Sequence, residues 1–92
     1  LDLNAVPYLK ELTHLPVVVD PSHGTGKRSL VAPMALAGIA AGADGLMIEA
    51  EPNPDSAMCD ASQTIEPAEL AMIVRKTRAI SELMRVDELA LA

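Results

Sequence analysis

The sequence predicts an α/β protein in which helices alternate with parallel strands. Two short apolar runs, residues 16–19 and 45–48, have the composition of strands that are covered on both faces. Helical patterns flank both runs, and such an alternation implies right-handed crossovers and parallel pairing. Two parallel strands cannot cover their own faces and edges. We therefore expect these 92 residues to form about a quarter of an eight-fold barrel or part of an open doubly wound sheet.

A short helix and a strand are expected first. Asn4 can cap a helix that reaches about Thr13 and carries three apolar residues on one side: Val6, Leu9 and Leu12. Pro16 then begins a strand that ends at Asp20.

A glycine-containing loop, a helix and the second strand follow. Gly24 and Gly26 predict a flexible loop. Ser29 can cap the next helix, which runs to about Ala41 before Gly42 ends it. The second strand is expected at residues 44–49.

A long loop and a final helix complete the pattern. Pro52 and Pro54 exclude regular structure from the loop at residues 50–65, and Pro67 begins the helix. Its inward stripe is expected to be Leu70, Ile73, Val74, Thr77, Ile80 and Met84. Residues 85–92 are expected to form a frayed tail.

Composition excludes several classes of function. The net charge is −6, and no basic surface is interleaved with aromatic residues, which argues against nucleic acid as the main partner. A single cysteine cannot form an internal disulfide and fits a reducing compartment. Neither a membrane-spanning run nor a signal-peptide pattern is present, so we expect a soluble, cytoplasmic protein. Half of the residues are apolar, yet Phe and Trp are absent, which suits a piece of a larger assembly.

Polar residues at the ends of the two strands are the main candidates for chemistry. Side chains at the carboxyl ends of parallel strands face the active site in α/β proteins, so His23 and Glu49 are expected to lie together. Asp60 in the long loop is a possible third partner. One nitrogen and two carboxylates suit manganese, iron or zinc. The alternatives are that His23 is a hydrogen-bonded loop residue and Asp60 an ordinary loop carboxylate.

Two further residues have a structural interpretation in preference to a chemical one. Cys59 could be a thiolate ligand, but a lone cysteine without a helix N-terminus or a clear basic neighbour is more often inert. His14 lies at a helix end, where its positive charge would be favourable.

The run Gly24-Thr-Gly-Lys-Arg-Ser29 suggests a second kind of site. A glycine-rich turn before a helix offers backbone N–H groups to phosphate, and Lys27, Arg28 and Ser29 could add contacts. The run is neither a Walker loop nor a dinucleotide fingerprint, because its spacing differs from both. Phosphate contact and a solvated loop are both open.

Three consecutive segments resemble one enzyme family. Residues 20–29 (DPSHGTGKRS), 30–45 (LVAPMALAGIAAGADG) and 46–49 (LMIE) are similar to 3-deoxy-7-phosphoheptulonate (DAHP) synthases, and the likeness extends from residue 1 to about residue 84. The resemblance implies that residues 1–92 are a partial, C-terminal domain of a (β/α)₈ TIM barrel, with strands seven and eight and their helices.

The same resemblance implies a function. Such synthases join phosphoenolpyruvate and erythrose 4-phosphate and release phosphate, as the first step of the shikimate pathway. Their divalent metal is held by a cysteine from an early strand and by three residues that correspond here to His23, Glu49 and Asp60. The full-length protein is expected to be a homo-oligomer, and the isolated fragment to be inactive.

Some positions depart from the family pattern. Cys59 stands where serine is usual, Glu51 where histidine is common, and Ala61 where glycine is common. Glu51 and Ala61 each flank an expected metal ligand, and these differences can alter the hydrogen bonds around the ligands. Two alternatives remain: a non-catalytic assembly element that needs a complementary chain, and a related sialic acid or 3-deoxyoctulosonate phosphate synthase.

Overall fold

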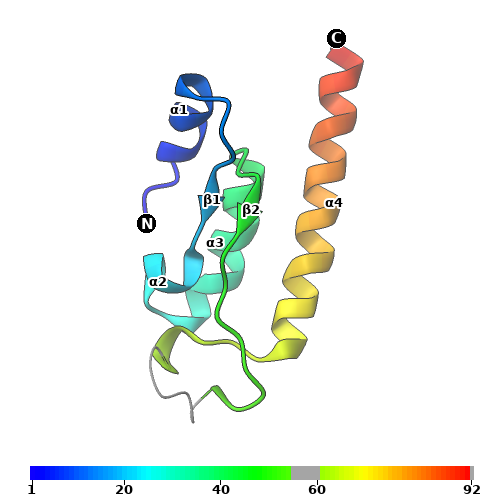
Figure 1. Cartoon of the computed structure of the whole chain (residues 1–92). Helices are drawn as coiled ribbons and strands as arrows, with labels where there is room; N and C mark the ends of the chain where they lie inside the picture. The colour runs from blue at the N-terminus through cyan, green and yellow to red at the C-terminus, as the bar shows by residue number, and fades with distance from the viewer. Residues whose placement is uncertain (55–60, 92) are drawn as a thin grey trace.

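The elements follow one another in the alternating order that the sequence predicts (Figure 1). The computed structural model describes residues 1–54 and 61–91, with side chains as far as Val86. In chain order the elements are α1 (Ala5–Leu12), β1 (Val18–Val19), α2 (Pro21–Thr25), α3 (Arg28–Ala40), β2 (Gly45–Leu46), the 3₁₀ helix η2 (Ala61–Gln63) and α4 (Pro67–Leu91).

The two strands pair in parallel, as expected. Val18 lies opposite Gly45 and Val19 opposite Leu46. Backbone hydrogen bonds continue past both ends of the ladder, where Asp44 N–H donates to Val17 and Met47 N–H donates to Val19. The regular strands are nevertheless shorter than the predicted ranges of 16–20 and 44–49. Each has only one neighbour in the two-stranded sheet, and an isolated bridge between Ala50 and Ile65 extends the pairing farther along the chain.

The core lies between the sheet and the two long helices. Val31 and Ala35 of α3, Ile65 just before α4 and Ile73 of α4 are fully buried and form one cluster, against which Leu46 and Ile48 pack. Helix α3 approaches the sheet closely at Gly38, where an added Cβ would lie 3.3 Å from a Val19 methyl group. Glycine at this position therefore lets the helix sit directly on β1.

The opposite face of the sheet is open. Among the described elements, none crosses in front of β1 and β2 in the view of Figure 1, and α3 lies behind them. Val18 is 56% exposed and Met47 is 58% exposed. The sequence pattern, which is apolar on both faces, therefore has only one face covered.

The first helix differs from the prediction in its buried side. Val6 is buried, as expected, but Leu9 and Leu12 are exposed, at 41% and 63%. The reason is that α1 has few packing partners within the described residues, so only one side chain of its apolar stripe is covered.

A short helix, α2, lies in the region where Gly24 and Gly26 favour a flexible loop. Helix α2 begins at Pro21, a residue well suited to the first helical position because its missing N–H is not needed there. The Asp20 carboxylate caps the helix by accepting the His23 backbone N–H. Gly26 ends it with a left-handed φ of 62°, which glycine adopts without strain.

The two long helices match their predicted positions with small corrections. Lys27, not Ser29, is the residue that precedes α3, and Ser29 lies in its first turn. Helix α4 begins at Pro67 as predicted, but Val74 of its expected inward stripe is 38% exposed. The α4 backbone is helical as far as Leu91, so the helix continues past Arg85; fraying of the tail in solution stays a prediction.

Within the described part of the chain, no helix combines the length and the apolar composition that crossing a bilayer requires.

An ion pair at the beginning of β2 predicts a pH dependence of stability. The Lys10 ammonium donates to the Asp44 carboxylate at 2.8 Å and the Val17 N–H donates to it at 2.7 Å, and together they hold the Asp44 pKa below its ordinary value of 3.8. A carboxyl group with a lowered folded-state pKa stabilises the fold above pH 3.8, and this contribution is lost as the pH falls through the folded-state pKa.

Asp44→Asn should therefore lower the melting temperature of the full-length protein at neutral pH, and the difference from wild type should shrink as the solution becomes more acidic than pH 3.8. Thermal unfolding at a series of pH values measures this. Lys10→Met should show the same trend, and a difference that does not vary with pH would contradict the assignment.

Candidate functional site

Helix α2 places the His23 side chain at the carboxyl end of β1. The two oxygens of the Asp20 carboxylate both contact this residue: Oδ1 accepts the His23 backbone N–H at 2.8 Å, and Oδ2 lies 2.7 Å from Nδ1 of the ring. The capping contact fixes the backbone and the second contact orients the imidazole. The ring is thus held by the residue that ends the strand.

Glu49 meets His23 from the neighbouring strand. Its Oε1 lies 2.8 Å from Nε2 of His23, and the two side chains are partly open to solvent, at 32% and 48% exposed. The backbone N–H of Glu49 donates to the buried Ser22 hydroxyl at 3.0 Å. The expected convergence of His23 and Glu49 is therefore confirmed, because residues following the ends of paired parallel strands share one edge.

The loop after the second strand supports the other oxygen of Glu49. The Thr64 hydroxyl lies 3.4 Å from Glu49 Oε2, a long contact from a residue that is almost fully buried. The N–H of Glu51 donates to Ile65, and the N–H of Ile65 donates to Glu49, so the backbones on either side of the loop are also joined.

The contacts of His23 and Glu49 suit a divalent cation. The 2.8 Å between Nε2 and Oε1 is a hydrogen-bond distance, and a cation that takes the place of the bridging proton could contact both atoms. Ligand atoms bound about 2.1 Å from a cation at right angles lie about 3 Å apart, close to this spacing.

The structure does not test the third expected ligand. Asp60 falls outside the described residues, as does Cys59. The described residues by themselves contain no group of three histidine, cysteine or acidic side chains arranged to hold a metal. His14 is exposed, away from this site.

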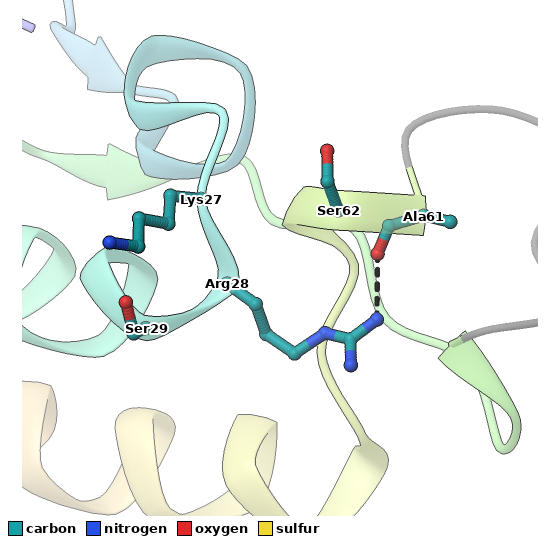
Figure 2. A pocket seen from close by; sticks show the side chains of 5 residues that line it. All are labelled: Lys27, Arg28, Ser29, Ala61 and Ser62. Carbon is teal, nitrogen blue, oxygen red and sulfur yellow. Dashed lines mark hydrogen bonds between the residues drawn. The ribbon is translucent and has the colours of Figure 1, made fainter.

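Arg28 joins the beginning of α3 to η2 and the residues that follow it. Its Nε donates to the carbonyl of Thr64 and its Nη2 to the carbonyl of Ala61, both at 2.7 Å. Figure 2 shows the guanidinium reaching toward Ala61. Hydrogen bonds from a charged donor are among the stronger ones, so Arg28 holds the backbone of Thr64, whose hydroxyl contacts Glu49.

A pocket of about 450 Å³ surrounds the basic run. It is lined by Lys27, Arg28, Ser29, Ala61 and Ser62. In Figure 2 the Lys27 side chain runs away from Arg28, so the two cations do not point to one spot. Contact of Lys27, Arg28 and Ser29 with a substrate phosphate stays a prediction.

Several supporting residues escaped the sequence analysis. The sequence pattern predicts Asp20 only as the end of a strand, and it predicts no role for Ser22 or Thr64. The Asp-Pro pair was a usable signal for Asp20, because an acidic cap followed by proline is a common start of a helix. No local pattern marks Thr64 or the clamp made by Arg28, which is its pair of hydrogen bonds to the carbonyls of Thr64 and Ala61. Both features depend on residues distant in sequence.

Comparison with known proteins identifies the family. The family model described as the DAHP synthetase I family matches residues 1–85. The chain belongs to this family. The resemblance inferred from residues 20–49 is thereby confirmed.

Relatives within and near the DAHP synthetase family share much of this sequence. A phospho-2-dehydro-3-deoxyheptonate aldolase of Thermotoga maritima is 37% identical over 86 residues, which are 94% of this chain and 25% of that protein. A 2-dehydro-3-deoxyphosphooctonate aldolase of Escherichia coli O157:H7 is 37% identical over 81 residues, 86% of this chain and 28% of that protein.

The fold also matches a solved member of the family. The crystal structure of the Thermotoga maritima phospho-2-dehydro-3-deoxyheptonate aldolase (DAHP synthase) superposes with a TM-score of 0.87 at 37% identity, covering 91% of this chain and 25% of that one. The chain thus spans about a quarter of the length of the relatives that it matches.

The clamp made by Arg28 predicts a specific loss of stability. Arg28→Met in the full-length protein removes two charge-assisted hydrogen bonds to backbone carbonyls and should cost about 1.5–3 kcal/mol of unfolding free energy. Denaturant unfolding measures the change. Lys27→Met, at the exposed neighbouring position, is the matched control and should change stability by less than about 0.5 kcal/mol. Equal effects of the two substitutions would contradict the clamp.

Proposed function

We propose that this chain is the last two βα units of the (β/α)₈ barrel of a DAHP synthase. The family match, the parallel strands and the helix–strand alternation support this proposal. The open face of the sheet supports it too, because Val18 and Met47 have the apolar character expected of side chains that face the interior of a complete barrel. In this proposal β1 and β2 are strands seven and eight.

The proposed reaction joins phosphoenolpyruvate to erythrose 4-phosphate. The methylene carbon of phosphoenolpyruvate forms a bond with the aldehyde carbon, water adds to the adjacent carbon that carries the phosphate oxygen, and inorganic phosphate leaves. The observation that carries the proposal is the contact of 2.8 Å between His23 Nε2 and Glu49 Oε1 at the carboxyl ends of paired strands. Active sites of barrel enzymes lie at this end.

The proposed cofactor is a divalent cation such as manganese, iron or zinc, held by His23, Glu49 and Asp60. When bound, it would act as a Lewis acid toward the aldehyde oxygen or orient the attacking water. The chain itself holds the two described ligands in place: Asp20 contacts the imidazole, Ser22 binds the backbone of Glu49, and Thr64 contacts its carboxylate. Lys27, Arg28 and Ser29 are proposed as a weaker contact for a substrate phosphate.

A related synthase is the second candidate. Its support is the identity of 34–37% to 2-dehydro-3-deoxyphosphooctonate aldolases of Vibrio atlanticus and Escherichia coli. An eight-carbon product made from three-carbon phosphoenolpyruvate requires a five-carbon aldose phosphate, whereas the seven-carbon product requires erythrose 4-phosphate. Assaying the full-length protein with both aldoses distinguishes the candidates, and we expect turnover with erythrose 4-phosphate.

Substitution of either described ligand should abolish turnover in the full-length protein. His23→Ala and Glu49→Ala each remove a proposed ligand of the cation and should lower kcat/KM by at least about 10³-fold. This loss corresponds to about 4 kcal/mol of transition-state stabilisation. Phosphate release with manganese present measures the rates. His14→Ala and Glu11→Ala replace exposed residues of the same types and should leave turnover unchanged. Near-normal rates for both site variants would reject the ligand assignment.

The 92 residues alone should have no synthase activity. They cover one face of a two-stranded sheet and leave Val18 and Met47 exposed, so they cannot close a barrel around two substrates. The purified fragment is tested for product with both substrates and manganese, beside the full-length protein at equal molarity. Stoichiometric product from the fragment would contradict the prediction.

A further inference from the structure

We propose that Asp20 is a positioning residue that fixes the tautomer of His23, so that Nε2 presents its lone pair to the cation beside Glu49. This inference rests on the proposed function, since it concerns the same cation. It assigns to Asp20 a role in cation affinity that is separate from its role in capping α2.

The geometry gives one carboxylate two tasks on one residue. Asp20 Oδ1 accepts the backbone N–H of His23 at 2.8 Å, while Oδ2 lies 2.7 Å from Nδ1 of the same residue. The ring of Pro21 fixes its own φ angle near the helical value and starts the helix, so Asp20 and His23 are held a single turn apart. Because both oxygens are engaged, the carboxylate cannot rotate without losing one contact.

The chemistry of the ring then follows from the chemistry of its partner. A neutral imidazole has one N–H donor and one acceptor nitrogen, and an ionised carboxylate can only accept. A contact of 2.7 Å between Oδ2 and Nδ1 therefore requires the proton to lie on Nδ1. Without a cation, the contact of 2.8 Å between Nε2 and Glu49 Oε1 is a hydrogen bond that needs a proton on Nε2 as well. A cation that takes the place of this proton leaves Nδ1–H on Asp20, and Nε2 is then the atom that coordinates.

The position of Nε2 shows why the tautomer matters. Nε2 lies 2.8 Å from Glu49 Oε1, so a cation bound there would touch both atoms. If Asp20 did not hold the Nδ1 proton, a neutral ring could keep its proton on Nε2, between the ring and Glu49. That proton would then have to move to Nδ1 before the cation could bind Nε2.

Asp20→Asn separates the two tasks of the carboxylate. The amide has the same shape but offers one oxygen and one NH₂ group. When its oxygen keeps the backbone N–H of His23, its NH₂ faces Nδ1 and shifts the ring proton to Nε2. Asp20→Ser is the second variant, because serine still caps a helix well but is too short to contact the ring.

The experiment measures binding of Mn²⁺ alone to the full-length protein. We expect Asp20→Asn and Asp20→Ser to weaken Mn²⁺ binding about 10- to 100-fold, the usual effect of removing a residue that supports a metal-binding histidine. In the metal-free Asp20→Asn protein at alkaline pH, ¹⁵N NMR of His23 should show the proton moved from Nδ1 to Nε2. A structural role in the cap would not move that proton.

Asp44→Asn is the matched control. It is the same substitution at the opposite end of the sheet, where it lowers stability without reaching His23. It should bind Mn²⁺ as wild type does. Wild-type affinity in both Asp20 variants would overturn the inference and leave the proposed cation site intact, whereas absence of Mn²⁺ binding that depends on His23 in the wild-type protein would overturn both.

Discussion

The parallel register of β1 and β2 is the constraint on which the site depends. Val18 lies opposite Gly45 and Val19 opposite Leu46, so the chain leaves both strands at the same edge of the sheet. His23 and Glu49 lie just after the carboxyl ends of these strands and contact each other there. In an antiparallel pair, the carboxyl ends of the two strands would lie at opposite edges of the sheet. Beyond the paired residues, the Glu49 N–H donates a hydrogen bond to the Ser22 hydroxyl. This bond directly joins the two segments that follow β1 and β2.

His23 and Glu49 are held from different directions by residues of three segments. Asp20 orients the imidazole from the end of β1, and Thr64 approaches the carboxylate from the segment before α4. Arg28 fixes that segment by binding its carbonyl groups from the first turn of α3. The base of the site therefore has a continuous hydrogen-bonded frame, which would reduce the reorganisation needed to bind the proposed cation.

The asymmetry of the sheet explains how such a site can belong to a chain this short. One face packs against α3 and α4 through a fully buried aliphatic cluster, while the other carries exposed Val18 and Met47. Buried parallel sheets need cover on both faces. The chain spans about a quarter of its relatives, and its superposition on the Thermotoga maritima protein extends over nearly all of its own length. A local piece of the family fold thus keeps its own packing and the contact between His23 and Glu49.

Three features could be predicted from the sequence: the alternation of helices and strands, the parallel pairing, and the contact between His23 and Glu49. These features follow from composition, from periodicity and from the geometry of strand ends, all of which are local or topological. Three other features could be seen only in the folded chain: Arg28 binds the carbonyls of Ala61 and Thr64, Leu9 and Leu12 stay exposed, and Thr64 contacts Glu49. Each of these depends on which distant residue lies nearby in space, and a one-dimensional pattern does not contain that information.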